Sequence, residues 1–338
     1  MQPFTYERVD TTTAAIAAFG QATPASASAS QYLAGGTTLI DLMKLDVMRP
    51  QTLVDINALD RTALGRIEAT GQGLRLGALA HMSEVADHPL ITRDYPMIAQ
   101  SLQLAASPQI RNMATLGGNV LQRTRCPYFR DVSYANCNKR IPGSGCAALD
   151  GFNRSHAVLG VSDACIATYP GDFGQALIAL DGTVELTGPN GNRTIAFGTL
   201  HRTPAGNPEI ETVLLPGEII TGFAIPAAPW LRRSLYLKIR DRQSYEFALA
   251  SAAIALDLGD DQIVREARIA LGGLATVPWR AKSAESALKG QQLNEQIVNV
   301  AADAAFADAM PRQHNRFKVA LGKRTLVRAL LQAATMEL

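Results

Sequence analysis

The first sixty residues alternate short extended patterns with helical ones. Residues 4–9 alternate between apolar and polar side chains, which predicts a strand. Asp10 or Thr11 can then cap an alanine-rich helix that ends near Phe19. The small residues 25–30 (ASASAS) predict a short connecting loop.

A second unit follows directly. A strand ends at 32–34, Gly35-Gly36 makes a turn, and an amphipathic pattern from Thr37 or Thr38 to about Val47 predicts a helix. The β-branched residues 52–56 predict the next strand. Strand, helix and strand in this order predict a βαβ unit with two parallel strands.

The pattern becomes more mixed after residue 60. It predicts short strands with glycine breaks at 65–81, a helix around 88–104, a glycine turn between two apolar segments at 111–122, a hairpin with a Gly-Pro-Asn-Gly turn at 177–197, and two short strands at 214–226. Residues 122–166 show little periodicity. An irregular stretch of that length in a compact protein is usually functional or disordered.

The C-terminal third has a simpler order. Three strands are predicted at 235–240, 247–258 and 263–271, and three helices at 281–289, 293–309 and 316–331. The pattern divides near 226–229. We therefore expect an α+β protein with a first domain over 1–226, made of the parts 1–60 and 61–226, and a second domain over 227–338.

The composition of the chain argues against several classes of function. The chain has 338 residues, 47% of them hydrophobic and 18% charged, with a net charge of +2. This apolar content supports a packed core, and the balanced charge argues against a dedicated nucleic-acid binder. The longest apolar run, 247–256, is half of what a membrane span requires. The first ten residues have no signal-peptide pattern, so a soluble protein is expected.

Two glycine pairs are candidate ligand loops. Residues 34–38 (AGGTT) place two glycines between a strand and a helix, where backbone N–H groups can point at a pyrophosphate. Residues 115–119 (TLGGN) place a second pair about eighty residues later. The alternatives are an ordinary turn with a threonine cap for the first pair, and a tight turn or bulge for the second. Two such loops together favour a dinucleotide.

All four cysteines fall within forty residues of one another. Cys126, Cys137, Cys146 and Cys165 are separated by ten, eight and eighteen residues. Paired C-x₂₋₄-C spacing, typical of zinc sites, is absent, whereas wide spacing suits a loop that wraps an iron–sulfur cluster. Zinc, two disulfides and four buried thiols remain open as alternatives. The segment is also basic, with five cations that could offset thiolate charge: Arg123, Arg125, Arg130, Lys139 and Arg140.

The sequence contains weaker indications of other catalytic or ligand-binding residues. The five histidines are scattered without paired spacing, and no G-x-S-x-G nucleophile motif occurs. Asp172 comes where the chain returns to regular structure after the last cysteine. Its carboxylate could accept hydrogen bonds from a ligand, or it could cap the helix that follows.

Taken in order, these motifs resemble the FAD-binding subunit of the molybdenum hydroxylases, the family of xanthine dehydrogenase and carbon monoxide dehydrogenase. The resemblance covers nearly the whole chain and is carried by six stretches: AGGTTLIDLMK, RNMATLGGN, GDFGQALIALDG, LLPGEIITGFAIP, KIRDRQSYEFALASAAIAL and IALGGLATVPWRA. The cysteine segment is similar to the flavin subunit of bacterial periplasmic aldehyde oxidoreductase through CPYFRD, CNKRIPGSGC, NRSHAVLG and SDACIAT.

The resemblance implies a fold and a set of site residues. The fold is a two-part FAD-binding domain of the vanillyl-alcohol oxidase (PCMH) type, followed by a smaller α+β domain like the C-terminal domain of carbon monoxide dehydrogenase flavoprotein. The four cysteines, on an insertion over 122–166, would hold a [4Fe-4S] cluster. FAD would contact Leu33, Ala34, Gly35, Gly36, Thr37, Thr38, Leu39, Ile40, Thr115, Gly117, Gly118, Asn119, Asp172 and, on a weaker match, Lys238.

The implied function is that of an electron-transfer subunit in a heterotrimeric aldehyde oxidoreductase, which oxidises aldehyde to carboxylic acid. A large molybdopterin-binding subunit and a small subunit with two [2Fe-2S] clusters would pass electrons to FAD and an external acceptor. No residue of this chain is expected to be catalytic by itself. The complex would be periplasmic if it is exported with a signal-bearing partner, and otherwise cytoplasmic.

Three other functions remain open. The β-subunit of 4-hydroxybenzoyl-CoA reductase also has a cluster-bearing insertion. A self-sufficient flavin oxidase would need a substrate pocket with a base, for which no motif is present. A structural module held by zinc or disulfides would be colourless.

Overall fold

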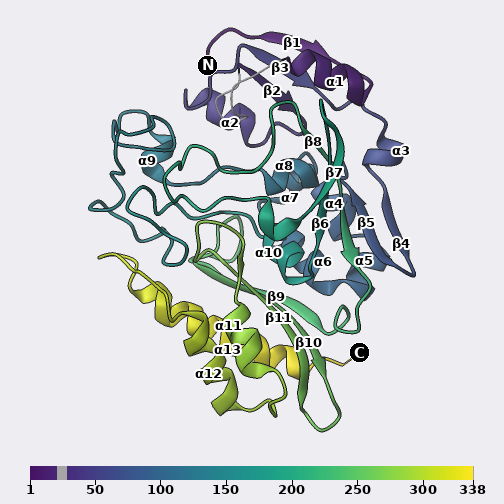
Figure 1. Cartoon of the computed structure of the whole chain (residues 1–338), viewed down its shortest axis with the longest axis vertical. Helices are drawn as coiled ribbons and strands as arrows, with labels where there is room; N and C mark the ends of the chain where they lie inside the picture. The colour runs from purple at the N-terminus through teal and green to yellow at the C-terminus, as the bar shows by residue number, and fades with distance from the viewer. Residues whose placement is uncertain (21–28, 338) are drawn as a thin grey trace.

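The computed structural model describes residues 1–20 and 29–337, and it arranges them around three sheets (Figure 1). Most of the loop predicted at 25–30 lies outside the described residues. The N-terminal sheet, the central sheet and the C-terminal sheet follow one another along the chain. This mixed helix and sheet content confirms the α+β fold class.

The N-terminal sheet is small and parallel. Its strands run in the order β1 (Thr5–Arg8), β3 (Thr52–Asp55) and β2 (Ser30–Leu33). Helix α1 (Thr12–Phe19) begins where Thr11 accepts a hydrogen bond from the N–H of Ala14 at 3.2 Å. Helix α2 (Leu39–Lys44) connects β2 to β3. The predicted βαβ unit is confirmed.

The central sheet is antiparallel and has five strands. Their order is β4 (Ile67–Thr70), β5 (Gly73–Gly77), β8 (Ile219–Pro226), β6 (Thr183–Gly188) and β7 (Gly191–Ala196). The Gly-Pro-Asn-Gly hairpin turn between β6 and β7 is confirmed. The prediction of two strands at 214–226 was wrong, because Gly217 has φ +77° and turns the chain just before the single strand β8.

Short helices occur along the chain between β3 and β8. They are α3 (Arg61–Leu64), α4 (Met82–Ala86), α5 (Pro89–Asp94), α6 (Pro96–Gln103), α7 (Pro108–Arg111), α8 (Leu116–Val120), α9 (Pro127–Arg130), α10 (Phe173–Ala179) and the 3₁₀ turn η1 (Phe197–Thr199).

Two predictions in this helical region need correction. The single helix expected at 88–104 is divided into α5 and α6, because Pro96 forces Tyr95 out of the helical region, to φ −133° and ψ 53°. The glycine turn expected at 111–122 is instead the helix α8, whose start Thr115 caps by accepting from the N–H of Gly118 at 3.2 Å.

The C-terminal sheet is buried on both faces. Its antiparallel strands are ordered β12 (Trp279–Arg280), β11 (Val264–Gly272), β10 (Ala250–Leu258) and β9 (Ser234–Ile239). Ile254 and Leu256 pack against helices α11 (Lys282–Leu288), α12 (Glu295–Ala305) and α13 (Phe317–Ala334). Ala253 and Ala255 face the core beside α6 and α10. Burial on both sides explains why β10 is apolar without alternation.

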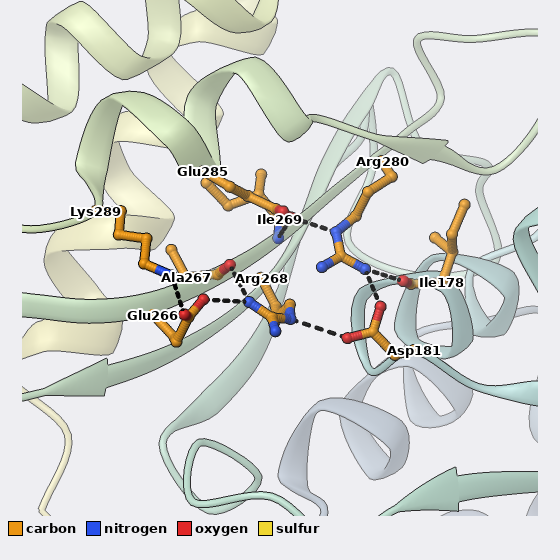
Figure 2. Close-up of polar contacts among 9 residues, drawn as sticks. All are labelled: Ile178, Asp181, Glu266, Ala267, Arg268, Ile269, Arg280, Glu285 and Lys289. Atoms are coloured by element: carbon orange, nitrogen blue, oxygen red, sulfur yellow. Dashed lines mark hydrogen bonds and ion pairs between the residues drawn. The ribbon is translucent and has the colours of Figure 1, made fainter.

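Ion pairs also join the C-terminal sheet to α10 (Figure 2). Asp181, just after α10, accepts from Arg268 Nε of β11 at 2.9 Å and from Arg280 Nη1 of β12 at 2.8 Å. Arg280 also donates to the carbonyl of Ile178 at 2.6 Å and pairs with Glu285. The change of pattern at 226–229 falls between β8 and β9, but because the two parts share a core, the domain limits stay a prediction.

Candidate functional site

The two glycine motifs lie against each other. An added Cβ on Gly35 would come within 1.9 Å of the carbonyl oxygen of Met113, two residues before the second motif. Only glycine permits this approach, because no real Cβ atom is found at such a distance from backbone. Segments about eighty residues apart thus form one wall, here called the glycine wall (residues 34–39 and 113–118).

The glycine wall borders a cleft with an empty volume of about 1290 Å³, part of it open to solvent. Eight of the predicted FAD-contact residues line the cleft: Ala34, Gly35, Gly36, Thr37, Thr38, Leu39, Thr115 and Gly118. Leu33, Ile40, Gly117 and Asn119 are next to them in the chain but do not line it. The side chain of Thr38 makes no capping hydrogen bond to α2, which leaves its hydroxyl free for a ligand.

The opposite wall of the cleft was missed by sequence reasoning. It consists of Phe19 and Tyr32 from the N-terminal sheet unit and of residues from the segment 210–218, here called the opposite wall segment. Tyr32 donates its hydroxyl hydrogen to the carbonyl of Gly217 at 2.9 Å, which holds the two parts together. Residues 214–218 belong to a stretch that carried the family resemblance, and this was the one signal that could have pointed to them.

Asp172 and Lys238 form a separate buried group. Lys238 Nζ lies 2.7 Å from Asp172 Oδ2, with side chains 1% and 5% exposed. The hydroxyl of Tyr236 donates to Asp172 Oδ1 at 2.6 Å, and burial beside this carboxylate raises the pKa of Tyr236 far above its usual range. Asp172 stands at the N-cap position of α10 but makes no capping hydrogen bond with its side chain, so its contacts do not support the capping alternative. Neither Asp172 nor Lys238 lines the cleft.

The segment 122–166, here called the cysteine loop, brings its four cysteines into one small buried cluster. Cys126, Cys137 and Cys165 are buried, and Cys146 packs against them together with Phe129 and Ile166. The backbones of Cys137 and Cys146 form an antiparallel bridge. All four are free cysteines, so the structure contains neither of the two disulfides considered as an alternative.

The thiols differ in their surroundings. Burial raises the pKa of Cys126 to about 12. A hydrogen bond from Cys165 lowers the pKa of Cys146 to about 6, and the same contact raises the pKa of Cys165. His156 Nε2 lies 3.1 Å from the sulfur of Cys126, and burial lowers the pKa of this histidine to about 4. Without a bound metal, Cys126 and Cys165 are therefore protonated, whereas the surroundings of Cys146 favour its thiolate.

The [4Fe-4S] site is not confirmed. Within residues 1–20 and 29–337, no group of three or more His, Cys, Asp or Glu side chains is arranged to hold a metal ion. The four cysteines belong to one hydrophobic cluster, and an iron–sulfur centre at this place stays a prediction.

The expected excess of positive charge is largely paired with acids from outside the loop. Asp41 of α2 accepts from Arg125 at 3.1 Å and from Arg130 at 2.8 Å. Glu211 of the opposite wall segment pairs with Arg123 and Lys139. Arg140 donates instead to loop carbonyls, including that of Phe129 at 2.9 Å. Only part of the positive charge is therefore available to offset thiolates.

The C-terminal region also fixes the cysteine loop. Lys318 of α13 is fully buried and donates to the carbonyls of Ser155, His156 and Gly273. Asn315 donates to the carbonyls of His156 and Ala157 at 3.3 and 3.0 Å. Burial lowers the pKa of Lys318 to about 7. These contacts tie His156, whose ring lies beside the sulfur of Cys126, to the start of α13.

Two protein-family models match the two parts of this chain. Residues 2–228 match the FAD binding domain in molybdopterin dehydrogenase, and residues 235–333 match the CO dehydrogenase flavoprotein C-terminal domain. The chain therefore belongs to the family of FAD-binding medium subunits of the molybdenum hydroxylases, and it is a flavoprotein component of an oxidoreductase.

Individual proteins of this family are similar to the chain over nearly its whole length. The chain is 45% identical to the aldehyde oxidoreductase FAD-binding subunit PaoB of Escherichia coli (strain K12), over 98% of this chain and 99% of that protein. It is 27% identical to the carbon monoxide dehydrogenase medium chain of Hydrogenophaga pseudoflava, over 97% and 96%. A solved carbon monoxide dehydrogenase from that organism, which lacks the Mo-pyranopterin moiety of its cofactor, matches with a TM-score of 0.74, 26% identity, and coverage of 98% and 97%.

In the part of the chain that the structure describes, no helix is both long enough and apolar enough to cross a membrane.

Proposed function

We propose that this chain is the FAD- and [4Fe-4S]-containing electron-transfer subunit of a heterotrimeric, molybdenum-dependent aldehyde oxidoreductase. The observation that carries the proposal is 45% identity, over nearly the full length, to a protein named as the FAD-binding subunit of an aldehyde oxidoreductase. Its partners would be a large molybdopterin-binding subunit and a small subunit with two [2Fe-2S] clusters, and it would reduce an external acceptor. The periplasm, by export with a partner, stays a prediction.

The cleft supports the FAD part of the proposal. Bound FAD would accept electrons singly and deliver them in pairs. Thr37 and Thr38 line the cleft, and hydroxyl donors at the start of a helix suit a pyrophosphate. The N–H groups of residues 116–119, by contrast, already donate within the chain. The apolar side chains of Phe19, Leu214 and Leu215 line the other side. A cleft with polar donors on one side and apolar side chains on the other suits a dinucleotide.

Asp172 and Lys238 are assigned to the same cofactor on the family resemblance. The buried pair, with Tyr236 and Ser251, forms a hydrogen-bonded network of fixed geometry. Such a network can orient donors and acceptors toward a ring edge without further rearrangement. Asp172 and Lys238 do not line the cleft, so their contact with FAD rests on the resemblance alone.

Cys126, Cys137, Cys146 and Cys165 would hold the [4Fe-4S] cluster, which would supply one-electron chemistry. Their support is that all four are free cysteines in one hydrophobic cluster, three of them buried and Cys146 partly buried. Replacing Cys137 with Ser should remove the chain's iron, with the N-terminal βαβ unit still folded. Ser133→Ala, an exposed change in the same loop, is the matched control. Iron that stays at about four atoms per chain in Cys137→Ser would show that the ligand assignment is wrong.

The activity is tested by producing this chain together with its two partner subunits. The complex should oxidise aldehydes to carboxylic acids with an artificial acceptor. The isolated chain should not turn over any aldehyde, because it lacks the molybdenum site. Turnover of an aldehyde or alcohol by the isolated chain would instead identify a self-sufficient flavin oxidase.

A further inference from the structure

One carboxylate connects the cysteine loop to the cleft. Glu211 accepts from Arg123 Nε at 3.0 Å and from Lys139 Nζ at 2.7 Å. Arg123 precedes Cys126 by three residues, and Lys139 follows Cys137 by two, so both cations belong to the cysteine loop. The three side chains are only 21%, 11% and 12% exposed. Shielding from water makes each of these ion pairs stronger than a pair on the surface.

Backbone contacts also hold the segment that carries Glu211 in place. The N–H of Arg202 donates to the carbonyl of Glu211 at 2.9 Å, and Lys139 Nζ also donates to the carbonyl of Pro208 at 3.1 Å. Across the pair, the guanidinium of Arg123 lies over the ring of Phe129 at 4.6 Å. Burial alone would raise the pKa of Glu211, but the two cations outweigh it and hold that pKa at about 2. The group is therefore charged at neutral pH.

The same residues face the cleft. Arg123 and Glu211 both line it, together with Ile210 and Thr212. Arg123 Nη2 is buried and has no hydrogen-bond partner within the described part of the chain. Because buried donors are nearly always bonded, this atom points to a ligand or water that completes the arrangement. Arg123 and Glu211 therefore belong both to the lining of the cleft and to the ion pairs that hold the cysteine loop.

We propose that Glu211 is a positioning residue through which occupancy of the cleft by FAD orders the cysteine loop. The inference rests on the proposed function, since it takes FAD as the occupant. Coupling between two sites is reciprocal, so an ordered cysteine loop would in turn favour FAD binding. Sequence position alone does not suggest this role, because Glu211 lies in none of the motifs that carried the resemblance.

The test measures how fast a thiol reagent labels the four cysteines, with and without added FAD. The full chain is used, in the complex in which it is purified, after a chelator has removed any iron. In the native protein FAD should slow labelling about tenfold, within the usual range for coupled sites. In Glu211→Gln the ratio of the labelling rate without FAD to the rate with FAD should fall to between about one and two. In Lys139→Gln, which keeps the ion pair with Arg123, this ratio should be intermediate.

Glu209→Gln is the matched control. Glu209 lies two residues away in the same segment and forms no ion pair among the described residues, so the native ratio should persist. A Glu211→Gln protein that keeps the tenfold ratio would overturn the proposal. So would equal acceleration of labelling in both states, since that is the mark of a purely structural role. A native protein that binds FAD without slowing labelling also contradicts it, whereas one that binds no FAD shows instead that the proposed function is wrong.

Discussion

The glycine wall and the cysteine loop are built in opposite ways. The wall is made by regular elements and local signals: a βαβ unit, the cap at Thr115, and the close approach at Gly35. The cysteine loop contains only the short helix α9 between residues 122 and 166. Side chains from distant parts of the chain hold it instead, above all Glu211 and Lys318. Backbone geometry at helix caps and glycines determines the glycine wall. Buried charges from distant parts of the chain hold the cysteine loop.

This difference means that the two regions should respond to different changes. The wall should be sensitive to volume added at a glycine, and the loop to charge removed from a partner far away in sequence. Two substitutions test this contrast directly and two more test charged groups elsewhere in the molecule, in order of decreasing expected effect.

The largest effect is expected for Gly35→Ala. Its Cβ would fall 1.9 Å from the carbonyl oxygen of Met113, and because that neighbour is backbone, the two motifs must move apart. Overpacking of this kind costs about 3 kcal/mol of stability. FAD affinity, measured by flavin fluorescence, should fall by about 100-fold. Gly71→Ala is the control, because its Cβ would meet nothing within 4 Å. Equal affinities in the two variants would contradict the close packing.

The second effect concerns Lys318→Met. The substitution keeps the length of the side chain but leaves buried carbonyls at Ser155, His156 and Gly273 without this donor. We expect a loss of about 2 kcal/mol in the free energy of unfolding. Lys323→Met on the same helix is the control, since its pair with Asp303 is exposed and should contribute less than about 0.5 kcal/mol. If both variants lose the same stability, the loop does not depend on the buried lysine.

A pH effect of similar size is expected at His201. Burial lowers its pKa from 6.5 to about 4. Between these values the unfolded histidine binds a proton that the folded one does not, so stability decreases as the pH falls from about 6.5 to 4. Each pH unit contributes at most about 1.4 kcal/mol. Urea titrations at several pH values should show a smaller acid loss for His201→Gln. An identical pH dependence would exclude His201 as its source.

The smallest effect is expected for Asp181→Asn, outside both regions. Asparagine accepts the positive φ of 52° found here, so the backbone should not change. The lost pairs with Arg268 and Arg280 join α10 to the C-terminal sheet, but Asp181 is 48% exposed (Figure 2). We expect a loss of about 0.5 kcal/mol, and less in 1 M salt. If Asp181→Asn lost more free energy of unfolding than Lys318→Met, the expectation that buried charges contribute more than exposed ones would be wrong.

The sequence predicted the regular parts well for a physical reason. Alternation and capping are local, and they correctly indicated the βαβ unit and the C-terminal strands and helices. The errors arose where one residue overrides a pattern. Pro96 divides a helix, and the pair Gly117-Gly118 sits inside α8 because Thr115 caps it. Neither outcome can be read from hydrophobic periodicity.

The candidate site was predicted only in part for a related reason. The glycine wall could be named because glycines mark close backbone contact. Phe19, Ile210 and Glu211 come to the cleft through tertiary packing, and no local sequence pattern indicates them. The cysteines were found from clustering alone, while their support from Asn315 and Lys318 depends on α13 packing back across the molecule.

The central claim is that this chain binds both FAD and an iron–sulfur cluster. The most direct test is one visible absorption spectrum of the purified protein, with iron and flavin determined on the same sample. We predict flavin bands with a broad brown shoulder, one FAD and about four iron atoms per chain. A colourless protein, or flavin bands alone with zinc or no metal, would contradict the claim.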